Sequence, residues 1–329
     1  MANDPLKYLA LIELPILLVI DERVHFANSA AQALLGSHIE QQDIRIALRD
    51  PEALRLIKTG QSGNVRLVGL SVKGSVWEMR YSMLNDKVGL ITLQDQSIQV
   101  SVARAHADFV ANASHELRTP LAAIRGYVET LLDPKAGDDP QTRHQFLTII
   151  KREAARMEAL VSDLMSLSRI EAIRHEIPSA EVDIVALCRE VLAEQTRNPA
   201  FTLETDNSRV LVAGDAPQLA QAIRNLVDNA EKYGTTEKAA MIRIEATDHG
   251  WVSIAIEDHG EGIAPEHLPR LTERFYRADA GRSRAAGGTG LGLAIVKHIV
   301  ERHRGRFDIK SRLGEGTTAT IMLPQLIQD

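Results

Sequence analysis

The chain has 329 residues, which is long for a single hydrophobic core and predicts two or three domains. Its formal charge of −6 is mild for this length and no block of Lys or Arg stands out, so a dedicated nucleic-acid-binding protein is not indicated. The single cysteine, Cys188, cannot form an internal disulfide. It lies in a helical pattern, which predicts a small apolar core residue and favours a reducing compartment.

No segment of the sequence has the pattern of a membrane span. The longest apolar stretch, residues 9–20, is interrupted by Glu13 and Pro15 and is shorter than the roughly 20 residues that cross a bilayer. The opening residues 1–5 have the features of neither a signal peptide nor a transit peptide. We therefore expect a cytoplasmic chain that meets a membrane only through an anchor missing from this sequence.

Residues 1–97 predict a small α+β domain. Short apolar runs between turns predict strands at 16–20, 24–26, 65–70, 76–83 and 88–93, and the pattern from 30 to 58 is helical. These strands favour an antiparallel sheet. The order of the elements resembles a PAS sensor domain, a likeness of pattern without a specific motif.

Residues 98–173 predict two long helices that form an antiparallel hairpin, with Asp139 as N-cap and Pro140 in the first turn of the second. Apolar residues recur at steps of three and four in both helices, at Phe109, Ala113, Leu117, Leu121, Ile124, Val128 and Leu131, and at Leu147, Ile150, Ala154, Met157, Val161 and Leu164. A lone hairpin leaves much of this seam in water. We therefore expect two copies to pair as a dimeric four-helix bundle, the alternative being a hairpin packed on its own flanking domains.

Residues 182–329 predict an α/β domain with a mixed sheet. Helices are expected at 184–194, 217–233 and about 290–303. Strands are expected near 201 and 210, at 241–247 and at 251–257, and two closing strands end at 323. The turn residues Asp248-His249-Gly250 predict a hairpin between the two central strands.

The segment Ser114-His115-Glu116-Leu117-Arg118-Thr119-Pro120 carries a polar strip on the first long helix. His115 lies about 200° around the helix from the seam residue Leu117 and should face outward, with Arg118 and Thr119 on its side. A neutral imidazole is a good nucleophile, and a carboxylate such as that of Glu116 can raise its basicity. Pro120 predicts a kink just below the histidine. Alone, an exposed helical histidine is usually solvated surface.

Two further motifs carry polar groups suited to a nucleotide. Asn225 and Asn229 lie one helical turn apart with Lys232 on the same face, and such groups suit Mg²⁺ and phosphate oxygens, although helical asparagines are commonly structural. The segment Asp258-His259-Gly260-Glu261-Gly262 follows a strand directly. Its aspartate can accept the amine of adenine and its glycines allow close approach to a ring, but the pattern alone also fits a plain turn.

The segment from Gly287 to Leu293 opens a helix, and the N–H groups of a glycine-rich helix N-terminus cradle phosphate. A Rossmann fingerprint would need glycine in place of Leu293, and no P-loop pattern occurs. Between these loops, residues 278–286 form a polar stretch with Arg282 and Arg284. It predicts a mobile lid whose arginines meet the γ-phosphate, the alternative being a plain surface loop.

Taken in order, residues 100–325 resemble the sensor histidine kinases of two-component signalling. The strip at His115 is similar to their H-box, and the N-, G1-, F- and G2-boxes are matched by residues 225–233, 258–262, 274–277 and 288–292. One departure is Thr272, where an aromatic residue is more usual, and it bears on how the lid is anchored. The amino-acid sequences of the H- and G2-boxes resemble those of the phosphate-regulon sensor subgroup.

The resemblance implies a Bergerat-type α/β-sandwich that binds ATP and Mg²⁺, behind a dimerising bundle. It implies that His115 is the phosphoacceptor, that Glu116 is its base, and that Thr119 positions a water for dephosphorylating a partner. By the same likeness Asn229 binds Mg²⁺, Asn225 and Lys232 lie by the phosphates, Tyr233 stacks near adenine, and Asp258, with Thr317 beside it, reads the adenine amine. The other implied nucleotide contacts are Gly260, Gly262, Phe275, Arg284, Gly288, Gly290, Leu291 and Gly292.

The resulting hypothesis is a homodimeric, multidomain α+β kinase that phosphorylates itself and then a receiver-domain aspartate of a response regulator. The PAS-like domain would bias the helices through residues 97–108. Such a chain is either cytoplasmic or the cytoplasmic part of an inner-membrane sensor. The rival hypothesis is an ATP-gated scaffold without histidine chemistry, since Bergerat-type folds also serve other ATPases. A regulatory pseudokinase is disfavoured because every nucleotide box keeps its polar residues.

Overall fold

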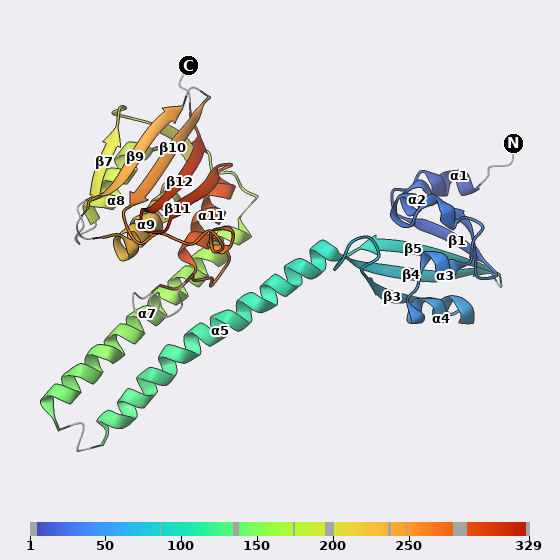
Figure 1. Ribbon diagram of the computed structural model, residues 1–329, viewed down its shortest axis with the longest axis horizontal. Helices are drawn as coiled ribbons and strands as arrows, with labels where there is room; N and C mark the ends of the chain where they lie inside the picture. The colour runs from blue at the N-terminus through green and yellow to red at the C-terminus, as the bar shows by residue number, and fades with distance from the viewer. Residues whose placement is uncertain are drawn as a thin grey trace. The chain divides into compact units, whose positions relative to one another are not determined.

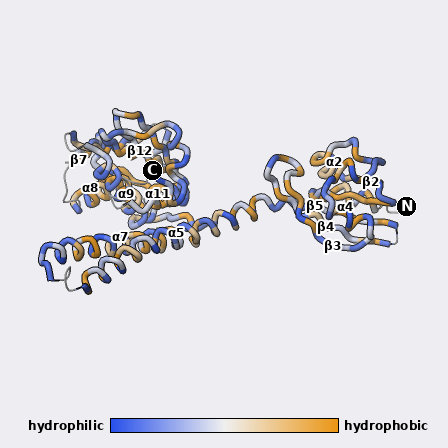
Figure 2. Tube along the Cα trace, turned by 60° about the horizontal axis from the view of Figure 1, so that its bottom comes forward, coloured by the Kyte–Doolittle hydropathy of each residue, from blue (hydrophilic) through white to orange (hydrophobic). Residues whose placement is uncertain are grey.

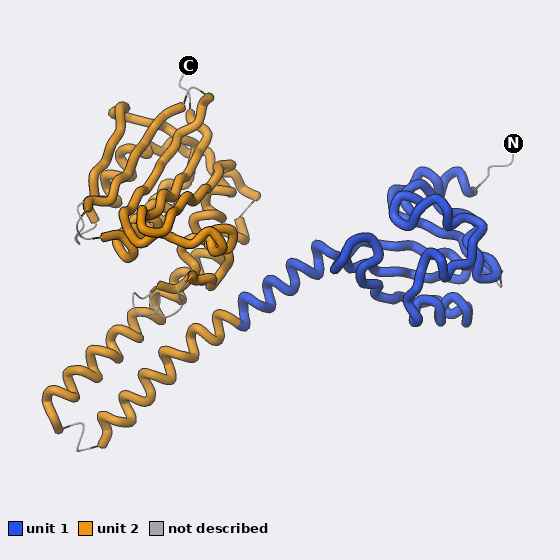
Figure 3. The backbone as a smooth tube through the Cα atoms, viewed as in Figure 1, with its two compact units in different colours: residues 1–111 blue, residues 112–329 orange. Residues whose placement is uncertain are grey.

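The computed structural model describes residues 5–85, 87–133, 138–173, 175–194, 201–235, 238–247, 249–278 and 288–326. The chain divides into two compact units, residues 1–111 and 112–329 (Figure 3). Within the described ranges, no helix has both the length and the apolar character needed to cross a membrane.

The first unit is built on a five-stranded sheet whose strand order is β2-β1-β5-β4-β3 and whose pairings are all antiparallel, as predicted. The strands are β1 (Ile16–Ile20), β2 (Arg23–Ala27), β3 (Gly63–Val68), β4 (Val76–Asn85) and β5 (Val88–Asp95). The helices are α1 (Pro5–Ala10), α2 (Ser29–Leu35), η1 (Ser37–Ile39), α3 (Ile44–Ala47) and α4 (Pro51–Thr59). The short helix α1 was not predicted.

Two long helices, α5 (Ser97–Leu131) and α7 (Pro140–Ala172), lie side by side and antiparallel (Figures 1 and 2). The carboxylate of Asp139 accepts the N–H of Thr142 at 2.9 Å, which confirms the predicted N-cap of α7 and lowers the pKa of that carboxyl. The rings of Tyr127 and Phe146 meet across the hairpin with centroids 5.1 Å apart. Although Pro120 removes one backbone donor, α5 runs on through it without ending.

Part of the predicted apolar seam is exposed in the single chain. The exposed fractions are 56% for Leu121, 42% for Val128, 52% for Leu147 and 47% for Val161. Near its C-terminal end, α7 packs against α11 of the following domain, and Leu167 and Ile170 are buried in this part of the helix. The hairpin therefore contacts its own flanking domain near the end of α7 and leaves the rest of the seam available to a second copy.

Inside the hairpin, one ion pair links the two helices beside the polar strip. Arg156 of α7 donates from Nη2 to Oε2 of Glu116 on α5 at 3.2 Å, and its Nη1 lies 3.9 Å from Oε2 of Glu153. The side chains of Arg156 and Glu116 are 13% and 25% exposed. Because both charges are largely removed from water, loss of one partner leaves the other poorly solvated.

The third part of the chain is a mixed sheet of order β11-β12-β10-β9-β7, in which only β7 and β9 are parallel. Its strands are β7 (Phe201–Thr205), β9 (Ala240–Thr247), β10 (Trp251–Asp258), β11 (Arg306–Arg312) and β12 (Gly316–Pro324). The helices α8 (Ile184–Glu194), α9 (Ala216–Tyr233) and α11 (Gly292–Arg302) pack against it, with the short η2 (Leu268–Arg270) nearby (Figure 1). This confirms the predicted helices and mixed sheet.

Two details of this domain add to the prediction. A second, two-stranded sheet pairs β6 (Ala180–Asp183) with β8 (Leu211–Gly214), and β6 was not expected. Cys188 is fully buried in α8, where burial raises the pKa of its thiol to about 12, so it is the core residue that its pattern predicted. Asp248, in the predicted β9–β10 turn, lies outside the described residues.

We expect Arg156→Met to destabilise α5 and α7 by about 2 kcal/mol, between the values typical of exposed and of fully buried ion pairs. Glu116→Gln should cost a similar amount, and the double variant should cost less than the two single changes together, because each single change already removes the same ion pair. Hydrogen exchange of the α5 and α7 amides measures these free energies of opening. Arg143→Met, at an exposed position of α7, is the matched control. Strictly additive effects would show that the pair contributes no coupling.

Candidate functional site

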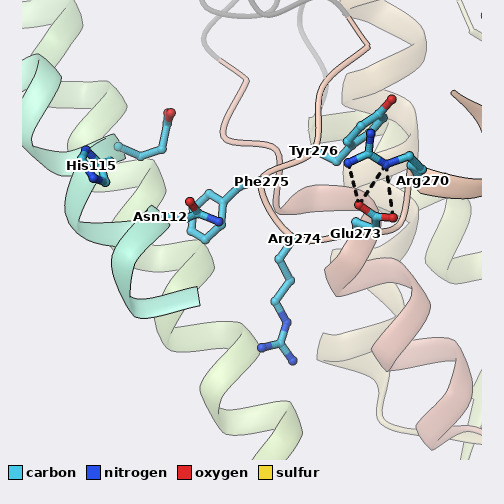
Figure 4. A pocket seen from close by; sticks show the side chains of 8 residues that line it. Asn112, His115, Arg270, Glu273, Arg274, Phe275 and Tyr276 are labelled. Atoms are coloured by element: carbon cyan, nitrogen blue, oxygen red, sulfur yellow. Dashed lines mark hydrogen bonds and ion pairs between the residues drawn. The ribbon is translucent and has the colours of Figure 1, made fainter. Parts of the chain in front are cut away.

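His115 is exposed on α5 and lines a pocket of about 310 Å³. Asn112 and Glu116 line it from the same helix. The other lining residues belong to the F-box, at Arg274, Phe275 and Tyr276, or lie just before it, at Arg270 and Glu273 (Figure 4). The predicted outward position of His115 is confirmed. The fold therefore places the F-box segment beside the H-box histidine, although some 160 residues separate them in sequence.

The carboxylate of Glu116 is held by two arginines. Its Oε2 accepts from Nη2 of Arg277 at 3.0 Å, in addition to the bond from Arg156 on the other helix. The Arg277 side chain is only 8% exposed. Among the described residues, no hydrogen bond joins Glu116 to His115. In this arrangement Glu116 is a charge partner of two arginines, both of which bind its Oε2.

Thr119 lies one turn after the histidine on the same face of α5, as predicted. Its hydroxyl donates to the backbone oxygen of His115 at 3.2 Å. This bond is the one usually made by a helical threonine, and it keeps the Oγ1 atom close to the helix surface below the histidine.

The N-box side chains lie on α9, and one of them, Asn225, contacts the first residue of α11. The amide of Asn225 donates from Nδ2 to the backbone oxygen of Gly292 at 3.2 Å. Asn229 is half-buried, whereas Lys232 and Tyr233 are exposed at the end of the helix. The structure thus brings Asn225 to the G2-box.

Asp258 ends β10 and is paired in register with Thr317 of β12. Its Oδ1 accepts the N–H of Gly260 at 2.9 Å. Burial raises the pKa of the Asp258 carboxyl, while hydrogen bonds from the backbone of Gly260 and Thr317 oppose the rise. The expected proximity of Thr317 to Asp258 is confirmed.

The glycines of the G1-box are needed for packing of the chain on itself. A Cβ at Gly260 would collide with the carbonyl oxygen of Tyr233, and one at Gly262, whose φ is +71°, would collide with that of Arg312. The sequence predicted that both glycines allow the backbone to approach a ligand ring closely. The structure gives a different reason, because here the backbone of the loop lies against the end of α9 and the β11–β12 turn.

Ser311 supports the same loop and was missed by the sequence analysis. Its hydroxyl accepts the N–H of Ile263 at 2.8 Å and lies 2.9 Å from Oγ1 of Thr317. A lone serine in an alternating strand gives no sequence signal for this role.

The G2-box forms the entry to α11. Gly290 has φ +73°, and its carbonyl accepts the N–H of Phe275 at 2.8 Å, so the G2-box and the F-box are joined through their backbones. Leu291 is the fully buried N-cap of α11, and no side chain caps this helix. The N-terminal end of α11, with Gly288 and Gly292 beside it, therefore presents a partial positive charge suited to an anion.

The F-box segment contacts α7 and the residues that precede it in the chain. Arg274 forms an ion pair with Glu171 of α7, and the Arg270 guanidinium lies 4.2 Å from the centre of the Tyr276 ring. Phe275 has a positive φ of 64°, which is uncommon for an aromatic residue. Thr272 is half-buried beside them. Arg282, Arg284 and Gly287, which the lid and G2-box predictions include, lie outside the described residues.

Three residues near the site were missed by the sequence analysis: Asn112, Arg156 and Asp163. Asn112 lines the pocket, Arg156 binds Glu116, and Asp163 of α7 accepts from the Thr289 hydroxyl at 2.7 Å. All three lie in long helices in which the apolar repeat is the main pattern. Their partners are 40 residues away for Arg156 and 126 away for Asp163, so no local pattern identifies them.

Comparison with known proteins identifies two domains. Residues 105–173 match the family of His Kinase A (phospho-acceptor) domains. Residues 214–327 match the family described as histidine kinase-, DNA gyrase B-, and HSP90-like ATPase. The first match contains α7 and His115, and the second contains the N-, G1-, F- and G2-boxes.

The chain is also similar to whole sensor proteins. It is 34% identical over 320 residues to the phosphate regulon sensor protein PhoR of Pseudomonas aeruginosa, covering 94% of this chain and 72% of that protein. It is 35% identical over 306 residues to the sensor-like histidine kinase SenX3 of Mycobacterium tuberculosis, covering 92% and 70%. Among solved structures, the histidine kinase AdeS of Acinetobacter baumannii matches 65% of this chain and 98% of its own at 24% identity, with a TM-score of 0.49. With the phosphoacceptor and ATPase domains in this order, and with the likeness to PhoR and SenX3 over most of its length, the chain belongs to the sensor histidine kinases, the ATP-dependent protein kinases of two-component signal transduction.

Proposed function

We propose that His115 is the phosphoacceptor of this kinase and that the phosphoryl group then passes to an aspartate on the receiver domain of a response regulator. One observation carries the assignment. His115 is exposed in a pocket shared with the F-box segment, and that segment is bonded through Phe275 to Gly290 at the entry of α11. The acceptor thus shares a pocket with a segment that is bonded to the loop suited to the phosphates of ATP.

In the proposed reaction a ring nitrogen of His115 attacks the γ-phosphorus of ATP. The new N–P bond forms as the bond from the γ-phosphorus to the β,γ-bridging oxygen breaks, and ADP leaves with that electron pair. The Glu116 carboxylate, which follows His115 directly in the chain, takes the ring proton. The protein contributes mainly position and charge, as in other phosphoryl transfers.

We assign the nucleotide contacts by the match of each box. Asp258 would accept the adenine amine and Tyr233 would stack near the base, while Asn225 and Lys232 would lie by the phosphates. Bound Mg²⁺, held by the amide oxygen of Asn229, would screen the phosphate charge. The uncapped N-terminus of α11 supports this placement. The remaining proposed contacts are Gly260, Gly262, Phe275, Arg284, Gly288, Gly290, Leu291, Gly292 and Thr317.

We also propose that the domains are those of a homodimeric sensor, at 1–97, 98–173 and 182–329. The exposed seam residues Leu121, Val128, Leu147 and Val161 support pairing of two hairpins into a four-helix bundle. The strand order β2-β1-β5-β4-β3 supports a PAS-like first domain. The likeness to PhoR supports a place in the phosphate-regulon subgroup.

Incubation with γ-labelled ATP tests the function. We expect the wild-type chain to acquire acid-labile label, because a phosphoramidate is hydrolysed in acid, and we expect His115→Ala to acquire none. His144→Ala, at an exposed position of α7, is the matched control and should label normally. ATP hydrolysis without any protein label would favour the rival, an ATP-gated scaffold.

Thr119→Ala should slow dephosphorylation of the phosphorylated regulator by at least about tenfold and leave autophosphorylation largely intact, because the hydroxyl would position the attacking water. Thr119→Ser keeps the hydroxyl and should retain the activity. Thr130→Ala removes a similar hydroxyl-to-carbonyl bond in the same helix and controls for the loss of that bond. Unchanged dephosphorylation in Thr119→Ala would end the phosphatase assignment.

Nucleotide affinity should fall as the pH is lowered. The fall should begin at a higher pH than it would if the carboxyl of Asp258 had the pKa of an ordinary aspartate. Burial raises the pKa of Asp258, so its carboxyl is protonated earlier as the pH falls and then no longer accepts the amine as a carboxylate. Titration of ADP binding from neutral to acid pH, in wild type and in Asp258→Asn, isolates this group from titration of the nucleotide itself. Parallel pH profiles for the two proteins would exclude Asp258 as the reader of adenine.

A further inference from the structure

The face of α7 that meets the ATP-binding domain combines apolar and polar contacts. Leu160, Leu167 and Ile170 are buried in the single chain, at 4%, 0% and 2% exposure. Ser166, between them, donates to Oε1 of Gln221 on α9 at 2.8 Å. Asp163 lies on the same side of the helix, three residues after Leu160 and four before Leu167. A carboxylate is thus placed within a largely buried contact surface.

Asp163 is bonded directly into the glycine-rich loop. Its Oδ2 accepts from the Thr289 hydroxyl at 2.7 Å, and the same hydroxyl oxygen accepts the N–H of Leu291, the N-cap of α11, at 3.3 Å. Burial raises the pKa of the Asp163 carboxyl, attraction to Lys232 opposes the rise, and repulsion by Asp228 adds to it. The N-box and the G2-box therefore both act electrostatically on this one side chain of α7.

Those groups are also the ones that suit phosphate. The N-terminus of α11 carries a partial positive charge, and Lys232 is a cation at the same edge of the domain. The Asp163 carboxylate already meets part of this positive field in the structure. A triphosphate bound at the same place would bring further negative charge close to a carboxylate that is poorly solvated, and like charges at short range raise the free energy of the complex.

We propose that Asp163 opposes nucleotide phosphate, so that binding of nucleotide and docking of the ATP-binding domain on α7 disfavour each other. The inference rests on the proposed function, which places phosphate at the G2-box. By linkage, the factor by which the docked Asp163 lowers nucleotide affinity equals the factor by which bound nucleotide lowers the equilibrium constant for docking. The ties of the same domain to the hairpin through Arg277 and Arg274 would then loosen with it, which frees Glu116 beside His115.

The test compares Asp163→Asn with Glu158→Gln. Asp163→Asn removes the charge and keeps the size of the side chain and an oxygen that can accept from Thr289. Glu158→Gln removes an equal charge from an exposed position of the same helix. Dissociation constants of ADP with Mg²⁺ are measured for the full chain, because ADP probes phosphate binding without allowing transfer.

We expect Asp163→Asn to lower the dissociation constant of ADP by about fivefold or more, the scale of a modest coupling between sites, and Glu158→Gln to change it little. Hydrogen exchange is the second readout. ADP should reduce protection of the α7 amides around residues 160–170 in wild type, and should reduce it less in Asp163→Asn. Asp163→Ala provides a second uncharged variant should the first fold poorly.

Two outcomes would overturn the inference itself, and a third would overturn the proposed function on which it rests. Equal dissociation constants for Asp163→Asn and wild type would show that the carboxylate does not oppose phosphate. Increased protection of α7 on adding ADP would show that nucleotide favours docking. Absence of ADP binding by every variant and by wild type would instead remove the nucleotide site itself, and so would be distinguishable as a failure of the proposed function.

Discussion

The carboxylate of Glu116 joins the two working parts of this kinase. One of its oxygens accepts from Arg156, which belongs to the hairpin, and from Arg277, which belongs to the ATP-binding domain. The first bond can persist whatever the position of that domain, whereas the second exists only when the domain is docked. Because the group is largely withdrawn from water, it needs at least one cation at all times. Arg156 therefore allows Arg277 to leave without stranding a charge.

The contacts between α7 and the ATP-binding domain have the same character. Besides the apolar contacts of α7, the surface contains the pairs Asp163–Thr289, Ser166–Gln221 and Glu171–Arg274. An apolar surface alone would respond weakly to the arrival of a charged ligand. Charged and hydrogen-bonded pairs at the edge of an anion site respond strongly, since their energy depends on every charge nearby. A carboxylate in this contact would therefore make docking sensitive to bound phosphate.

The sequence predicted what local patterns determine. Alternation predicted the strands of both sheets, the Asp139-Pro140 pair predicted the start of α7, and the 200° offset from Leu117 predicted that His115 faces outward. The strand β6 was missed because four residues carry too little periodicity. Arg156, Asp163 and the Arg277–Glu116 bond were missed because their partners lie 40 to 161 residues away. The G1 glycines were found, but the collisions they avoid are with chain segments that only folding brings near.

The helix α7 has room for both a second hairpin and the ATP-binding domain. Its exposed seam residues Leu147 and Val161 share one stripe, and Leu160 and Leu167, which are buried, share another about 130° around the helix. Two stripes at this separation can be covered at once by different neighbours, as a helix inside a bundle usually is. Docking on α7 and pairing of two chains therefore need not compete. It follows that a dimer can hold its bundle fixed while each ATP-binding domain docks and leaves.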